Sequence, residues 1–209
     1  MKVESCITLV LALLCTLVAT AQTTPDNDFG VWTSVDVSKR LTDRWSVGMR
    51  GEYRTRDLSR TTNLWFVRPS VGYKPLPWLA LALSYDYFWR PAVAQHRALF
   101  DISETYSTGG LTVSLRERFI AAYAPKGRQW SWLFRPRLTV KYRIGETRCS
   151  PYIAFELYAN RHWTMMHNFA GLQVALGHGS SLDLFYLFGL NNRTARQDHI
   201  VGVGYGLKL

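Results

Sequence analysis

WSVGMRGEYRTR, residues 45–56, alternates between two chemical classes along its whole length. Every second residue from Trp45 to Tyr53 is apolar, aromatic or glycine, and the residues between them, continuing to Arg56, are small or charged. Because successive side chains of a β-strand point to opposite faces, this pattern predicts one strand between two different environments. The apolar face fits the core of a soluble sandwich, or the lipid around a membrane barrel whose lumen is polar.

The same alternation recurs along the chain and predicts eleven strands, most of them near ten residues long. They cover residues 29–38, 45–56, 64–74, 78–89, 98–107, 111–122, 130–143, 151–158, 168–176, 182–190 and 199–209. A strand that crosses a membrane at a tilt needs about 9–11 residues, whereas strands of soluble proteins have about 5–6. Residues 29–209 are therefore predicted to form one all-β domain, a transmembrane antiparallel up-and-down barrel of about 10–12 strands. Since bacterial barrels have even strand counts, we expect either that residues 29–38 are no full wall strand or that one strand is merged or missing in this set.

Connections and aromatic residues also follow the pattern of an outer-membrane barrel. Short connections such as residues 75–77 and 108–110 alternate with longer ones such as residues 90–97 and 160–167, as periplasmic turns and external loops do. Aromatic residues gather near the strand ends in two girdles, which are expected at the level of the lipid headgroups. The first girdle contains Trp65, Tyr87, Trp89, Trp130 and Trp132, and the second contains Trp45, Tyr73, Trp78 and Tyr142.

Two acidic residues do not fit this pattern. Glu104 and Glu117 fall on the apolar faces of their predicted strands. A β-bulge inserts one residue and so reverses the alternation. We therefore expect a bulge near these residues that turns both carboxylates toward the lumen.

The first 21 residues have the composition of a secretory signal peptide. Lys2 precedes a nearly unbroken apolar run over residues 7–18, and Ala19-Thr20-Ala21 supplies the small residues of a cleavage site. The apolar run is shorter than the roughly 20 residues that a membrane helix needs. We therefore expect export, a flexible lead over residues 22–28, and a barrel located in the bacterial outer membrane.

The polar faces of the predicted strands are rich in basic residues. The chain of 209 residues carries a formal net charge of +10, and its basic residues are interleaved with apolar ones, which argues against nucleic acid as a partner. Basic residues outnumber acidic ones by ten to five on these faces. The candidate binding residues are Arg50, Glu52, Arg54, Arg68, Asp86, Arg116, Arg118, Arg135, Arg137, Lys141, Glu156 and Asp183, and Arg56, Asp101 and Arg143 complete the set.

Two interpretations of this polar set are open. Rings of Arg and Lys select anions, so the set could line a narrow passive pore for small anionic solutes. Alternatively, Arg–carboxylate pairs could fill the barrel and stiffen it, which is a structural role. Barrels of about eight strands are filled by side chains and barrels of 16–18 leave an open channel, so 10–12 strands lie between these cases. In both interpretations the chain is expected to be a monomer that contacts outer-membrane lipid.

The sequence does not show an enzyme. His96, His162 and His167 are expected in or beside external loops, where Asp86 could approach His96 and Glu156 could approach His162. Neither pair forms a recognisable catalytic motif, and the chain has no established metal-ligand pattern or nucleotide fingerprint. We therefore expect no cofactor and no metal. The alternatives are an outer-membrane hydrolase that acts on lipid or peptide, and a soluble periplasmic β-protein that binds a small ligand.

Three stretches resemble an uncharacterised family. They are DFGVWTSVDVSKRLTDRWSVGMRGEYRTRD (residues 28–57), SLRERF (residues 114–119) and HIVGVGYGLKL (residues 199–209). They resemble a family of outer-membrane β-barrels, a domain of unknown function common in Bacteroides-type bacteria. Members usually end in phenylalanine, whereas this chain ends in Leu209. The resemblance implies a fold and a location, and it implies no activity.

Overall fold

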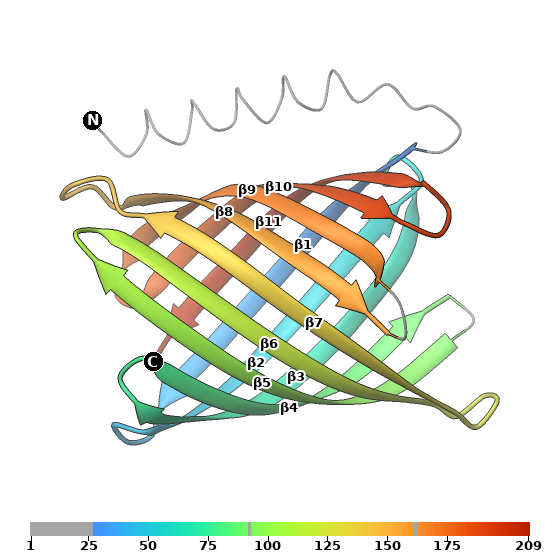
Figure 1. Ribbon diagram of the computed structural model, residues 1–209, viewed down its shortest axis with the longest axis horizontal. Coiled ribbons are helices and arrows are strands. Elements are labelled where there is room, and N and C mark those ends of the chain that lie inside the picture. The colour runs from blue at the N-terminus through green and yellow to red at the C-terminus, as the bar shows by residue number, and fades with distance from the viewer. Residues whose placement is uncertain (1–26, 92, 161–162) are drawn as a thin grey trace.

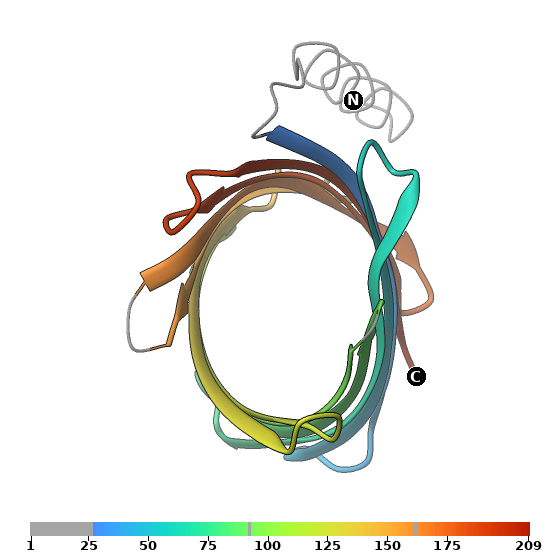
Figure 2. The same cartoon turned by 90° about the vertical axis from the view of Figure 1, so that its right-hand side faces the viewer.

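The computed structural model describes residues 27–91, 93–160 and 163–209, and over these residues the chain forms eleven strands closed into one barrel (Figure 1). The strands are β1 Asn27–Arg40, β2 Trp45–Arg56, β3 Thr61–Leu76, β4 Leu79–Arg90, β5 Val93–Thr108, β6 Leu111–Ala124, β7 Gln129–Tyr142, β8 Cys149–Ala159, β9 Trp163–Gly177, β10 Ser180–Asn191 and β11 Gln197–Lys208. The predicted barrel of 10–12 strands is confirmed, and its outline along the axis is elliptical (Figure 2). In the part of the chain that the structure describes, no helix is both long and apolar enough to cross a membrane. The predicted signal peptide and most of the predicted lead lie outside the described residues.

The barrel closes between its first and last strands, which run parallel to each other. Their register covers twelve residue pairs, from Asn27 with Gln197 to Ser38 with Lys208. The other neighbouring strands are antiparallel, so an odd number of strands requires one parallel pair at the closure. The expectation that residues 29–38 are no full wall strand, or that a strand is merged or missing, is therefore wrong. An odd count is also known in the 19-stranded mitochondrial channel.

The ten connections between strands do not show the predicted contrast in length. Rim A is defined here by connections 57–60, 91–92, 125–128, 160–162 and 192–196, and rim B by connections 41–44, 77–78, 109–110, 143–148 and 178–179. The longest connection has five residues at rim A and six at rim B. The prediction was wrong because residues assigned to loops, such as 93–97 and 163–167, belong to strands. The inner face of a barrel strand is itself polar, so polarity alone does not mark a loop.

The alternation in β2 assigns its faces correctly. Trp45, Met49 and Tyr53 are 48%, 49% and 43% exposed on the outer face, whereas Glu52 is 7% exposed inside. Most residues of the two predicted girdles are also exposed, up to 70% for Trp132. The outer surface of the barrel is therefore broadly apolar, with aromatic rings near both rims.

Glu104 and Glu117 lie on the outer face without a bulge. The pairs formed by β5 with β4 and with β6, and by β6 with β7, keep a continuous register. Glu104 is exposed and close to rim B, and Glu117 is partly exposed opposite Ile102 and Pro136. The predicted reversal is therefore wrong. A carboxylate on the outer face of a membrane barrel costs less than a guanidinium, which makes this placement tolerable.

Glycines of β11 leave room for aromatic rings at the closure. Gly202 is the register partner of Trp32 on β1 and of Phe185 on β10. A Cβ at Gly202 would collide with the Phe185 ring, so the ring lies directly over the glycine. Trp32 and Phe185 pack edge to face with their centroids 6.4 Å apart. Gly202 thus allows these two large rings to project inside the barrel.

Replacing Gly179 with alanine is expected to lower the free energy of unfolding by about 1–3 kcal/mol. Gly179 forms the β9–β10 turn with a φ of +75°, and a Cβ there would collide with the Lys208 carbonyl oxygen. Urea unfolding in detergent micelles measures this loss. Gly109→Ala is the matched control, because Gly109 also has a positive φ of +53° but open space around it. Equal losses in the two variants would contradict a role for the close approach to Lys208.

Candidate functional site in the barrel lumen

A cavity of about 600 Å³ lies inside the barrel, and all eleven strands contribute to its wall. Arg90, the last residue of β4, lines it at rim A. Lys208, the last residue of β11, lines it at rim B. The wall of this cavity therefore includes residues of both rims, and the cavity is the candidate functional site.

Cationic side chains dominate the wall of this cavity. Ten cationic and four anionic side chains line it. The cations are Arg50, Arg54, Arg68, Arg90, Arg97, Arg116, Arg118, Arg135, Arg137 and Lys208, and the anions are Asp36, Glu52, Glu156 and Asp183. Asp86 and Asp101 add two buried carboxylates that bind arginines of the wall. Cationic side chains outnumber anionic ones whether or not these two carboxylates are included.

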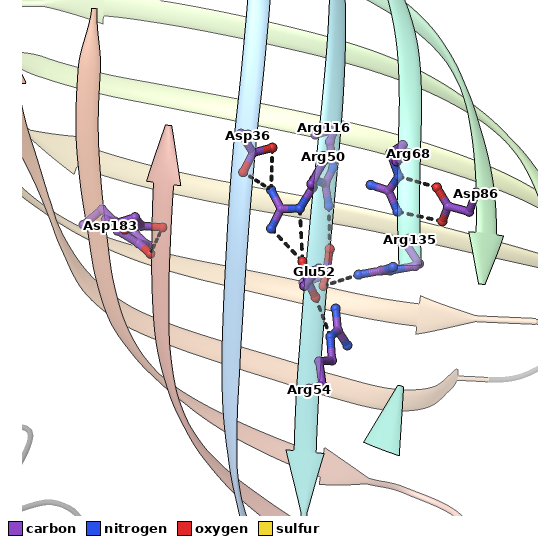
Figure 3. A network of polar contacts seen from close by, with 11 residues as sticks. Asp36, Arg50, Glu52, Arg54, Arg68, Asp86, Arg116, Arg135 and Asp183 are labelled. Carbon is purple, nitrogen blue, oxygen red and sulfur yellow. Dashed lines mark hydrogen bonds and ion pairs between the residues drawn. The ribbon is translucent and has the colours of Figure 1, made fainter. Parts of the chain in front are cut away.

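The first ion-pair cluster is built on β1 and β2. Arg50 donates to both carboxylate oxygens of Asp36 at 3.1 and 3.2 Å, and to Glu52 at 2.7 and 3.0 Å (Figure 3). Arg54 donates to the other oxygen of Glu52. These residues alternate along one strand face and so point inward together. The Glu52 side chain, which is 5% exposed, is thereby paired with an arginine at each of its two oxygens.

The second ion-pair cluster centres on Glu156 of β8. Arg116 of β6 and Arg135 of β7, both labelled in Figure 3, donate to the two oxygens of Glu156 at 2.5 and 2.8 Å. The Glu156 side chain is 2% exposed. His167 of β9 is also buried, and its Nδ1 lies 3.8 Å from Glu156. Four neighbouring strands thus place three cationic or protonatable side chains around one buried carboxylate.

Two further pairs link neighbouring strands. Arg68 on β3 binds Asp86 on β4 through two hydrogen bonds of 2.5 and 2.8 Å. Arg118 on β6 binds Asp101 on β5 through two hydrogen bonds of 2.7 and 2.6 Å. Paired donors of one guanidinium on one carboxylate form a strong and directional contact. These pairs tie the β3–β6 part of the wall together from the inside.

The remaining predicted residues occupy different places. Asp183 accepts a hydrogen bond from Tyr152 at 3.2 Å, and Lys141 donates to Gln173 at 3.0 Å. Arg137 lies over the Phe169 ring at 4.2 Å and binds no carboxylate of the described residues. Arg56 and Arg143 lie outside the main cavity. A register shift between Arg54 and Thr55 ends the alternation before Arg56, and Arg56 pairs with Asp57 at rim A. Arg143 lines a smaller pocket near rim B.

Many of the inner guanidinium groups lie over aromatic rings. These contacts between guanidinium groups and rings were not predicted from the sequence. Arg54 lies over Trp32 at 3.5 Å and Arg135 over Tyr158 at 4.2 Å. Further contacts of this kind join Arg68 to Phe66, Arg90 and Arg97 to Phe88, and Arg137 to Phe169. A cation over a ring face is attracted by the ring quadrupole. The signal was present in the sequence, because Phe66, Phe88 and Tyr158 share the parity of inner charged residues.

Arg90 and Arg97 were assigned to a loop, but both line the cavity. Arg90 ends β4, and Arg97 lies in β5. The alternation of inner residues Asp86, Phe88 and Arg90 continues to the end of β4 and could have placed Arg90 correctly.

Of the two predicted histidine pairs, the structure describes both residues only for Asp86 and His96, and this pair is not formed. Asp86 is buried inside and binds Arg68, whereas His96 lies on the outer face and its Nδ1 contacts the Tyr85 hydroxyl at 2.5 Å. His162 lies outside the described residues. His167 is not in a loop as expected, since β9 begins at Trp163 and its alternation turns His167 inward.

An ion pair at rim A fastens the closure. Arg196, in the β10–β11 connection, donates to Asp28 of β1 at 2.5 Å and to Asp198 of β11 at 3.1 Å. Burial lowers the pKa of Arg196, but the two carboxylates outweigh burial and raise this pKa above its ordinary value. Arg196 therefore stays charged and bridges the parallel pair at its start.

Comparisons with known proteins found similar solved structures and one protein family. Four solved chains match, and one of them is a KdgM porin with a TM-score of 0.49 and 11% sequence identity, covering 78% of this chain and 85% of the porin. No curated protein sequence matches. A family model described as "Protein of unknown function (DUF2490)" matches residues 29–199, which extend from β1 into β11. The predicted occurrence in Bacteroides-type bacteria stays a prediction.

Proposed function

Because the chain belongs to DUF2490, a family of proteins of unknown function, we propose its function from the barrel itself. It is a monomeric outer-membrane β-barrel that forms a narrow passive pore with a basic lumen for small anionic solutes. The observation that carries this proposal is the cavity whose wall includes Arg90 at rim A, Lys208 at rim B and more cations than anions between them.

The outer surface supports a location in a membrane. Large apolar side chains such as Leu83 and Ile153 are 64% and 63% exposed, which a protein in water would normally bury. Aromatic rings near both rims match the girdles of outer-membrane barrels. The predicted signal peptide supports export across the inner membrane. A closed barrel that is apolar outside and charged inside is the arrangement that suits a bilayer.

Membrane fractionation tests the location. We expect the protein to remain with the membranes and to migrate differently on a gel with and without heating, because detergent does not unfold a closed barrel at room temperature. A protein that is soluble without detergent and shows no mobility shift would instead support the soluble periplasmic alternative.

The ion-pair clusters favour the structural role as a second candidate. Glu52 and Glu156 each bind two arginines, so both carboxylates are engaged in cross-linking the wall. The clusters would stiffen the barrel even if no solute passed. The two candidates differ in whether the lumen conducts, which an electrical measurement decides.

Purified protein in planar bilayers is expected to conduct and to prefer chloride over potassium. Arg137→Gln should lower the chloride preference roughly twofold, because it removes a lumen cation without leaving a buried carboxylate unpaired. The reversal potential under a potassium chloride gradient gives this ratio. Arg128→Gln is the matched control, because Arg128 is exposed in the connection 125–128 at rim A, outside the cavity.

Two results would contradict the pore. The first is a wild-type protein that shows no conductance although its gel mobility proves that it is folded, which would leave the structural role. The second is a wild-type preference for potassium. An equal change in both variants would show that general rim charge, not the lumen, sets selectivity.

A further inference from the structure

Two arginines at the rim A end of the lumen bind no carboxylate among the described residues. The Arg90 guanidinium group makes no hydrogen bond with the described residues, and its central carbon lies 5.1 Å from the centroid of the Phe88 ring. Arg97 lies 3.3 Å from the same centroid. Both line the main cavity. Two guanidinium groups therefore share one ring at the mouth of the barrel.

The neighbouring carboxylate is already engaged. Asp86 is the direct register partner of Arg97 on β4. Its two oxygens instead accept hydrogen bonds from Arg68 on β3, at 2.5 and 2.8 Å. Two arginines thus flank one aspartate, and Arg68 takes both of its oxygens. Arg97 is left with a positive charge that its own wall does not neutralise.

The side chain of Arg97 is held in place by its neighbours. Arg97 donates through Nε and one amino group to the Gln95 side-chain oxygen, at 3.1 and 2.7 Å. Its other amino group has no partner among the described residues. Phe88, which supports both guanidinium groups, is 4% exposed and packs in a buried cluster with Leu64 and Phe66. A fixed ring and a glutamine therefore hold Arg97 in place with one amino group unused, and Arg90 lies near the same ring.

We propose that Arg90 and Arg97 form a binding site for a phosphate group at the rim A mouth of the lumen. Two like charges close to one ring repel each other, and the attraction of both to a doubly charged oxyanion would offset this repulsion. Arginine forks match the oxygens of phosphate, and arginine rings line phosphate pores. The proposal rests on the proposed function, since the phosphate would be that of a solute entering the pore.

The position of the arginines favours a solute over a lipid headgroup. Arg90 and Arg97 line the cavity, whereas the outer face of the same hairpin carries Tyr85, Tyr87 and His96. A lipid phosphate outside the wall would meet these rings and not the guanidinium groups. Free phosphate and the phosphate of a soluble monoester share the chemistry that the site recognises.

Titration calorimetry of the detergent-solubilised full chain tests the site. The probes are inorganic phosphate, glycerol phosphate and, for the lipid source, short-chain phosphatidic acid, each at constant ionic strength in chloride. We expect both soluble phosphates to bind. Arg90→Gln with Arg97→Gln should weaken that binding at least tenfold, because the site loses both charges. Arg128→Gln with Arg193→Gln should bind as the wild type does, since it removes the same charge from exposed connections at rim A.

A lysine variant separates the fork geometry from charge alone. Arg90→Lys with Arg97→Lys keeps both charges and the wall intact, and we expect intermediate binding. Folding of every variant is checked by heat-dependent gel mobility. If the Arg90→Gln and Arg97→Gln double variant does not fold, the test rests on the double lysine variant. Phosphate binding with wild-type affinity in the lysine variant would overturn recognition by the arginine fork.

The outcomes distinguish this site from the pore. Wild-type affinity for phosphate in the folded glutamine variant, or no phosphate binding by the wild type, would overturn the site while leaving chloride conductance untouched. Binding only of phosphatidic acid would also overturn it and indicate a lipid contact. Phosphate binding in a protein that does not conduct would support the site and remove the pore.

Discussion

Glu156→Gln is expected to lower the free energy of unfolding by about 3–5 kcal/mol, because it removes the carboxylate shared by two buried arginines. Arg116 and Arg135 would each keep a charge inside the wall without the counter-ion that now lies 2.5 and 2.8 Å away. Glutamine retains the size of the side chain, so lost packing contributes little. Urea unfolding in phospholipid vesicles, followed by tryptophan fluorescence, measures the change.

Asp57→Asn provides the control for this loss. Asp57 pairs with Arg56 at rim A, where the side chains are 53% and 46% exposed, so the expected loss is below about 1 kcal/mol. A triple variant with Glu156→Leu, Arg116→Met and Arg135→Met should recover most of the stability, since no unpaired charge remains. If Glu156→Gln loses no more than Asp57→Asn, Glu156 does not hold the wall together.

Leu83→Arg is expected to destabilise the barrel by about 2–4 kcal/mol in a bilayer, because it places a guanidinium among lipid chains. Leu83 is 64% exposed on the outer face of β4. It lies between Trp78 near rim B and Trp89 near rim A, and therefore near the middle of the apolar band. A similarly exposed leucine in a soluble protein would change stability by no more than about 0.5 kcal/mol.

Leu41→Arg is the matched control for the outer face. Leu41 is 56% exposed in the connection 41–44 at rim B, beyond the apolar band. We expect a change within about 0.5 kcal/mol there. Unfolding in vesicles gives both values. A small and equal effect at the two positions would contradict a membrane location and favour the soluble alternative.

The alternation of side chains predicted most of the wall and most of its inner charges. Arg50, Glu52 and Arg54 face the lumen as expected, because the two faces of a strand follow from a period of two residues. The places where this reasoning failed have local causes. Arg97 is predicted in a loop but lies in β5, because a polar inner face resembles a loop, and Arg56 lies beyond a register shift that alternation cannot show.

By itself, the sequence determined the class of fold, the two faces of its strands and the positive character of the lumen. These follow from hydrophobic periodicity and charge, which are local properties of the chain. Only the tertiary structure decided that β1 closes the barrel parallel to β11 and that two arginines share Glu156. It also decided that Asp86 pairs with Arg68, which leaves Arg97 without a carboxylate partner among the described residues. Those choices depend on which residues of different strands meet across the wall. In WSVGMRGEYRTR the period shows that Arg50 points inward, but the register of β1 on β2 decides that Asp36 meets it there.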